Sequence, residues 1–291
     1  MIKKLTPTLP LALALMLTAC GTSGQQPVQP GAKQQAADAS ADPGVGHVHG
    51  LGVDPATGRT YVAGHFGLFA LEGGKLSRVG DRDADHMGFT VAGPGTFYAS
   101  GHPSAADIGA GQAPHLGLIR SSDAGRTWEQ VALAGAADFH ALQVAGSTVY
   151  GYDSQTGQIW RGRGRDLEPA ARLDLLDLAA GASEPERLYA TTPAGVRVST
   201  DAGRTFKPVQ TAPLLSFLDV TGRGRLAGIA PDGQVHTSSD GAATWRPAGR
   251  LPMQAVAFTA VSADHLLAAA MDGTVYESKN AGQDFTVVHR P

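Results

Sequence analysis

Short apolar segments separated by glycine, aspartate and serine recur along the chain from residue 47 onward. Many of them are rich in β-branched, aromatic or aliphatic residues, as at 60–63, 149–151 and 188–190, and this pattern predicts short β-strands. The region shows no helical period. A glycine followed by a further short strand recurs at intervals of 38 to 50 residues, at Gly67, Gly117, Gly157, Gly195, Gly233 and Gly273.

Each repeat contains four short strands. Two of them lie upstream of the glycine, the third follows the glycine, and the fourth follows the last turn of the repeat. Four strands in about 40 residues are typical of one blade of a β-propeller. Residues 47–291 are therefore predicted to form an all-β, six-bladed β-propeller. A β-sandwich or a β-helix is the alternative fold, and a seventh blade would have to take its strands from the segment before residue 47.

The first residues have the pattern of a bacterial lipoprotein signal, predicted over residues 1–19. Lys3 and Lys4 give a positive start, an apolar run follows at 9–17, and a lipobox ends at Cys20. Cys20 is the only cysteine, so we expect it to be acylated and expect no disulfide. The alternative is an ordinary signal peptide with a chance cysteine. The prediction is an exported protein anchored by lipid to the cell envelope, on the extracytoplasmic side of the membrane.

Residues 20–46 are predicted to be the acylated cysteine and a disordered tether, since this segment is rich in Gly, Gln, Pro, Ala and Ser and offers little apolar surface for a core. The formal net charge of the chain is −3. A mildly acidic chain without a basic stripe is a poor candidate for binding nucleic acid.

Two predicted turns between third and fourth strands match the Asp-box pattern Ser/Thr-x-Asp-x-Gly-x-Thr-Trp/Phe at every fixed position. Their residues are Ser121, Asp123, Gly125, Thr127 and Trp128, and Ser199, Asp201, Gly203, Thr205 and Phe206. Two further copies are incomplete: the turn 238–245 keeps Asp240 and Trp245, and the turn 278–285 has Asn280 for Asp. We expect a structural role, because the Ser and Asp oxygens accept turn N–H groups and the aromatic ring packs between sheets.

The opposite face of the propeller is expected to hold the chemistry, because the starts of the inner strands and the second-to-third-strand loops meet there. Aligned starts of the inner strands carry His47, Asp85, Asp138 and Asp174, and the layer two residues later carries His49, Met87 and His140. The loops add His65, His102 and His115, and His86 lies beside Met87.

Seven of the ten histidines thus fall between His47 and His140. We predict a ligand site at His47, His49, His102 and His140, with His49, Met87 and His140 as metal ligands. Imidazole with thioether suits copper, and imidazole with carboxylate suits zinc. The alternative is that inner-strand histidines bond neighbouring blades and the loop histidines are incidental.

A second hypothesis is glycoside hydrolysis with Asp85, Asp138 and Asp174 as the acid and base candidates. It requires two of these carboxyl groups at about 5–10 Å from one another. Capping or salt bridging at the starts of the strands is the alternative role of these residues.

The Asp-box repeats are similar to those of sialidases, sortilin-type receptor domains, photosystem II assembly-factor propellers and large xyloglucanases. This resemblance implies a propeller and not a reaction. The stretches at 47–51, 87–89, 99–103 and 138–142 resemble bacterial exported Asp-box proteins that are described as glycosyl hydrolases by similarity. Residues 44–82 lack the Arg-Ile-Pro-like motif of sialidases, so sialidase activity is not expected.

The sequence therefore leaves two functions open. The first is a binding or scaffold module, attached to a membrane by its lipid, for a metal, a small polar ligand, a glycan or a protein partner. The second is a glycoside hydrolase, and whether the chain is an enzyme stays undecided at this point.

Overall fold

The computed structural model describes residues 42–291. The predicted signal over 1–19, Cys20 and most of the predicted tether lie outside the described residues. Within 42–291, no helix has both the length and the apolar character needed to cross a membrane.

The first three sheets follow one another along the chain and have four strands each. The first sheet contains β1 (Val48–Val53), β2 (Thr60–Gly64), β3 (Gly67–Glu72) and β4 (Lys75–Arg78). The second contains β5 (Asp85–Gly93), β6 (Thr96–His102), β7 (Leu118–Ser121) and β8 (Glu129–Ala132). The third contains β9 (Phe139–Ala145), β10 (Thr148–Asp153), β11 (Gln158–Arg163) and β12 (Asp166–Arg172).

The last three sheets repeat this order. The fourth contains β13 (Asp177–Ala180), β14 (Leu188–Thr192), β15 (Gly195–Ser199) and β16 (Lys207–Pro208). The fifth contains β17 (Phe217–Gly222), β18 (Arg225–Ile229), β19 (Gln234–Ser238) and β20 (Arg246–Arg250). The sixth contains β21 (Ala255–Ala260), β22 (Leu266–Ala270), β23 (Val275–Ser278) and β24 (Thr286–His289). A short helix, α1 (Ala105–Gly109), lies between β6 and β7.

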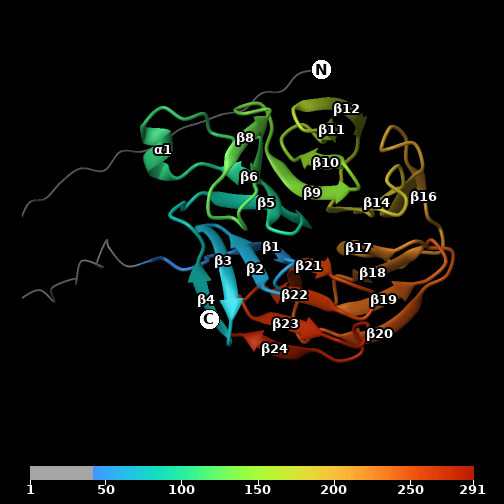
Figure 1. Ribbon diagram of the computed structural model, residues 1–291. Helices are drawn as coiled ribbons and strands as arrows, with labels where there is room; N and C mark the ends of the chain where they lie inside the picture. Colours follow the sequence, from blue (N-terminus) through green and yellow to red (C-terminus); the bar gives the residue numbers. More distant parts are fainter. Residues whose placement is uncertain (1–41) are drawn as a thin grey trace, which may run out of the picture. The chain divides into compact units, whose positions relative to one another are not determined.

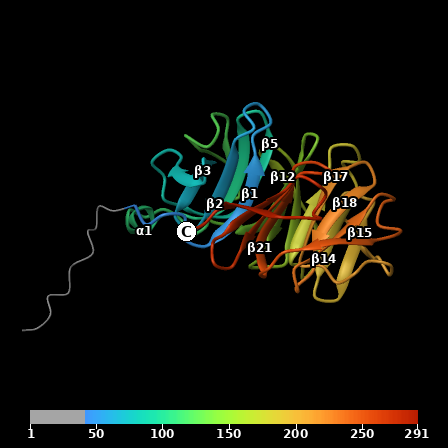
Figure 2. The ribbon, with the colours of Figure 1, turned by 90° about the horizontal axis from the view of Figure 1, so that it is seen from below.

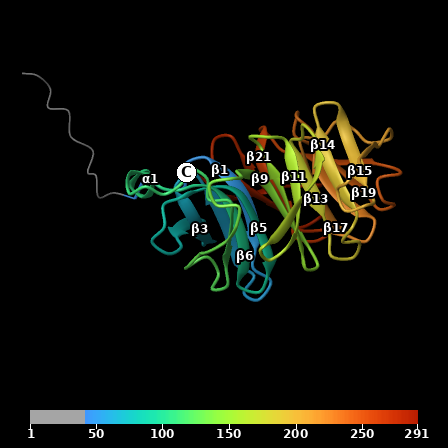
Figure 3. The ribbon, with the colours of Figure 1, turned by 90° about the horizontal axis from the view of Figure 1, so that it is seen from above.

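The six sheets form a ring around their first strands (Figure 1). The inner strands contact one another in sequence, from β1 to β5, β9, β13, β17 and β21, and β21 packs back against β1. The views at right angles show β1 beside β21 where the ring closes (Figures 2 and 3). Each sheet consists of four consecutive antiparallel strands, so the described residues confirm a six-bladed β-propeller.

Six apolar clusters hold the blades together, and each lies between two neighbouring sheets. Phe139 and Tyr150, on the third sheet, are among the largest fully buried side chains. Burying a side chain of this size contributes about 1.5–3 kcal/mol relative to leaving it exposed. The stability of the ring therefore comes from repeated blade-on-blade packing, as expected for a repeat fold.

The four turns at 121–128, 199–206, 238–245 and 278–285, here called the Ser-x-Asp turns, join the third and fourth strands of their blades. In the first of them, Ser121 Oγ accepts the N–H of Gly125 at 2.8 Å, and Asp123 Oδ1 accepts the N–H of Thr127 at 2.9 Å. The turn at 238–245 makes the same bonds through Ser238 and Asp240 although Ala242 replaces the glycine. The other two turns make the equivalent bonds, so the Ser and Asp or Asn oxygens of each turn are bonded within the turn itself.

Candidate metal-binding site

The inner strands of the first three blades begin with a β-bulge on the same side of the ring. The extra residue in each bulge is His49 in β1, Met87 in β5 and His140 in β9. A bulge interrupts the alternation of a strand and redirects the side chain of the extra residue. The three residues that the sequence aligned in one layer thus occupy equivalent positions in the structure.

Loops between second and third strands bring further histidines to this face. His65 lies in the turn between β2 and β3, where its N–H donates to the carbonyl of His47 at 3.0 Å. In the second blade, His102 ends β6 and His115 lies in the long loop before β7. Gly101, next to His102 in β6, allows the close approach of β5, because its φ is +139° and a Cβ there would lie 2.1 Å from the Asp85 carbonyl oxygen.

The first group of donors, here called the first triad, consists of His49, His65 and Asp85. Its three ligand atoms all lie within 4.8 Å of one another. His65 Nδ1 is 3.0 Å from Asp85 Oδ2, and His49 Nε2 is 3.4 Å from Asp85 Oδ1. The triad joins the first and second blades, since β1 and the turn between β2 and β3 supply the imidazoles and β5 supplies the carboxylate.

The second triad consists of His102, His115 and Asp138, whose ligand atoms also lie within 4.8 Å of one another. His102 Nε2 is 3.3 Å from Asp138 Oδ2. Asp138 stands just before β9, so this triad joins the second and third blades. His140 adds an Nε2 atom 3.0 Å from Asp138 Oδ2, and Ser154 and Gln155 reach the same oxygen.

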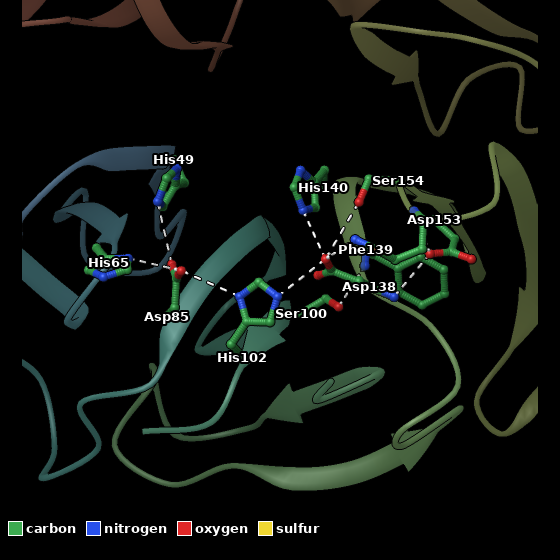
Figure 4. Close-up of polar contacts among 11 residues, drawn as sticks. His49, His65, Asp85, Ser100, His102, Asp138, Phe139, His140, Asp153 and Ser154 are labelled. Carbon is green, nitrogen blue, oxygen red and sulfur yellow. Dashed lines mark hydrogen bonds and ion pairs between the residues drawn. The ribbon is translucent and has the colours of Figure 1, made fainter. Parts of the chain in front are cut away.

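The ring of His102 lies between the two carboxylates (Figure 4). Its Nδ1 atom is 3.5 Å from Asp85 Oδ2, while its Nε2 atom faces Asp138. Figure 4 shows the resulting row, which runs from His49 and His65 through Asp85, His102 and Asp138 to His140. Neither triad is local in the sequence, so the row exists only when three blades are packed together.

Several of the nitrogen and oxygen atoms that could bind a metal in the triads are buried and make no hydrogen bond. These atoms are His49 Nε2, Asp85 Oδ1, His115 Nδ1 and Asp138 Oδ1. Both carboxylates are buried, the Asp138 side chain to 1% exposure, and within residues 42–291 their only ion-pair partners are histidines. A buried carboxylate destabilises the folded state unless a positive charge lies beside it, and a histidine is positive only when it is protonated. The site therefore has acceptor atoms and negative charge available for a cation.

Two ligands of the triads, His49 and Asp138, are in the ionisation state that metal binding requires. Burial lowers the pKa of His49, an effect that outweighs the opposing charge of Asp85, so its imidazole is neutral at physiological pH. Burial raises the pKa of Asp138, but the hydrogen bond from His140 and the charges of His140 and His102 outweigh it and leave the pKa lowered. Metal ligands must be deprotonated, and these two groups are.

The other residues predicted for the site are His47, Met87 and Asp174. His47 is exposed on the same segment as His49, and Met87 occupies the bulge of β5, a position equivalent to that of His49 in β1. Asp174 is exposed and lines a shallow hollow beside the turn between β10 and β11.

His86 does not lie in the row. Its ring packs 5.2 Å from the ring of Trp128, between centroids, and burial lowers its pKa to about 4. Its place in the sequence cluster is therefore incidental to the site.

The fold and the two triads define the class of protein, a six-bladed β-propeller with a His/Asp row at one mouth of the ring. The chain matches no protein-family model. No curated protein matches it either.

Similar solved structures are propellers of low sequence identity. YCF48 bound to D1 peptide aligns with a TM-score of 0.53 and 14% identity over 84% of this chain and 82% of that one. The Pan2 WD40 domain of Neurospora crassa aligns with a TM-score of 0.53 and 10% identity over 80% of this chain and 88% of that one. The GH74 xyloglucanase from Xanthomonas campestris aligns with a TM-score of 0.52 and 16% identity over 85% of this chain and 55% of that one. These similarities establish the fold alone.

Proposed function

We propose that this protein is an exported, lipid-anchored propeller that acts as a binding module and holds a divalent transition metal, zinc or copper, in its His/Asp row. One observation carries the proposal: His49 Nε2 and Asp85 Oδ1 face each other at 3.4 Å, and neither atom makes a hydrogen bond. Two donors bound to one tetrahedral zinc ion at 2.0–2.1 Å lie about 3.3 Å apart. The separation is that of two ligands of one ion.

The donor set indicates the kind of metal. Each triad offers two imidazoles and one carboxylate, a combination that suits zinc and also copper, whereas magnesium and calcium prefer oxygen ligands alone. Three protein ligands leave a coordination position for a group from outside. A small polar ligand, or a side chain of a protein partner, would bind the metal at that position.

Binding is better supported than glycoside hydrolysis. A glycosidase needs a general acid whose pKa is raised, but the pKa of Asp138 is lowered by His140 and His102. Asp174 is exposed and belongs to neither triad. Among the similar propellers, the YCF48 structure contains a bound peptide, which supports a partner-binding role for this kind of ring.

Metal analysis of the full chain, produced without a histidine tag, tests the proposal. We expect the wild-type protein dialysed against zinc or copper to retain metal, and the variant Asp85→Asn/Asp138→Asn to retain less than a tenth as much. The variant His236→Ala is the matched control, because His236 lies on β19, outside the row. Negligible metal in the wild-type protein, or equal metal in wild type and the double variant, would refute metal binding at the row.

A further inference from the structure

Resting on the proposed function, we infer that the mouth binds two metal ions, one in each triad, and that His102 connects the two sites. The ring of His102 separates the carboxylates of Asp85 and Asp138, with one nitrogen directed at each. A single ion held by the first triad would lie on the Nδ1 side of this ring, and an ion held through Nε2 would lie on the other side. Each carboxylate also keeps its own unpartnered Oδ1 atom.

The two triads are one arrangement repeated in successive blades. In each, the carboxylate stands at the start of an inner strand, Asp85 at β5 and Asp138 before β9. In each, the preceding blade supplies imidazoles from the connection between its second and third strands. These are His65, from the turn, in one case, and His102, at the end of β6, with His115, from the loop, in the other. A propeller repeats its backbone geometry from blade to blade, so a site built once between two blades is available again one blade later.

The third ligand differs between the triads for a reason visible in the sequence. The first triad takes His49 from the bulge of β1, whereas the equivalent bulge of β5 carries Met87. In the second triad, two histidines come from the connection between the second and third strands of the second blade, His102 at the end of β6 and His115 in the long loop. Both triads therefore reach the same composition of two imidazoles and one carboxylate.

The repetition stops at the third blade. Asp174 aligns with Asp85 and Asp138, and His140 occupies the bulge of β9. The turn between β10 and β11, however, carries Ser154, Gln155 and Thr156 instead of histidine. Asp174 is exposed there, and His140 bonds Asp138 instead. Two complete triads are thus the number that this chain offers within residues 42–291.

His102 couples the two sites chemically. When Nε2 binds the second ion, the neutral ring carries its proton on Nδ1, which faces Asp85 Oδ2 at 3.5 Å. Metal-binding histidines commonly donate their other N–H to a carboxylate, and loss of such a partner costs 10–100-fold in metal affinity. Here the carboxylate is itself a ligand of the first ion. Replacing His102 should therefore remove the second ion and weaken the first.

Equilibrium dialysis of the untagged full chain against zinc, followed by metal analysis, counts the ions. We expect two zinc ions per chain in the wild type and one in each of His65→Ala and His115→Ala, because each variant lacks one ligand of one triad. Both residues lie in surface loops, so the variants should fold, which circular dichroism checks. His102→Ala should bind one ion, with about 10–100-fold weaker affinity than His115→Ala.

The outcomes separate the two proposals. One ion per wild-type chain, lost in Asp85→Asn/Asp138→Asn, would overturn the pair and leave the proposed function standing. No ion in the wild type would refute both. Two ions retained by His65→Ala or by His115→Ala would overturn the assignment of the triads. Equal affinity of the remaining ion in His102→Ala and His115→Ala would overturn the coupling through His102.

Discussion

The carboxylates of the Ser-x-Asp turns and those of the mouth differ in where their partners come from. Asp123 is bonded within its own hairpin, to Thr127 and Ser121, and these bonds lower its pKa to about 2. Asp85 and Asp138 have histidine partners from other strands and loops, and each leaves Oδ1 without a hydrogen bond. A carboxylate whose bonding is complete locally stabilises a turn, whereas one whose partners come from two blades and leave an oxygen unbonded is available to bind.

Metal removal should therefore destabilise the protein through the mouth alone. One zinc ion at about 1,000 times its dissociation constant stabilises the folded state by about 4 kcal/mol, which corresponds to about 8–16 °C in the melting temperature of a domain this size. We expect a chelator to lower the melting temperature of the wild type by at least that amount and to leave Asp85→Asn/Asp138→Asn unchanged. Differential scanning calorimetry measures both.

The control for this prediction is His236→Ala, which keeps both triads and should respond to the chelator as the wild type does. An equal response of the wild type and the double Asp variant would place the stabilising metal somewhere other than the mouth. It would also remove the contrast between the two kinds of carboxylate.

The turns should show the reverse behaviour, a loss of stability without a loss of metal. Ser121 is buried, and its Oγ accepts the N–H of Gly125. Ser121→Ala leaves that buried donor unpaired, at a cost of about 1–3 kcal/mol, or about 2–12 °C in melting temperature. Ser122→Ala, at the exposed neighbouring position, is the control. A change in bound metal in Ser121→Ala would contradict the separation of the two faces.

Much of the fold could be predicted from the sequence because it is repeated. Regular glycines and turn residues specified six four-stranded units, and aligning the repeats placed His49, Met87 and His140 at one position, which the bulges confirm. Even the incomplete turn at 278–285 keeps the hydrogen bonds of the complete turns. Asn280 and Asp284 replace the usual Asp and Thr, and Asn280 Nδ2 donates to Asp284 Oδ2 at 3.0 Å.

The grouping of the site residues could not be read from the sequence. His65 and His115 join the triads through the conformations of their loops, which the repeat pattern does not determine. Asp174 aligns with Asp85 but faces a turn without histidine. Histidine enrichment at the mouth was a usable signal. Pairing each inner-strand aspartate with the loop of the preceding blade would have separated Asp85 and Asp138 from Asp174.

A third kind of carboxylate lies between the later blades. Asp177 accepts the N–H of Leu218, across a blade interface, at 2.9 Å, and Asp219 accepts that of Ala260 at 2.9 Å. Burial raises the pKa of Asp177 to about 7 and that of Asp219 to about 6. Unlike Asp138, these groups have no imidazole partners among the described ion pairs, so burial dominates.

Because the pKa of Asp177 is raised and that of Asp138 is lowered, their contributions to stability should respond to pH in opposite directions. A carboxyl group has a pKa of about 3.9 in the unfolded chain, so the folded protein binds the Asp177 proton more tightly than the unfolded chain does. The stabilising contribution is full below about pH 4 and is lost as the pH rises through about 7. Asp177→Asn cannot titrate. With metal removed, the melting temperature of the wild type relative to this variant should fall by a few degrees between pH 4 and pH 8, as calorimetry would show. The exposed Asp83→Asn should give a much smaller change, and a constant difference between wild type and Asp177→Asn would show that Asp177 stays ionised at this interface.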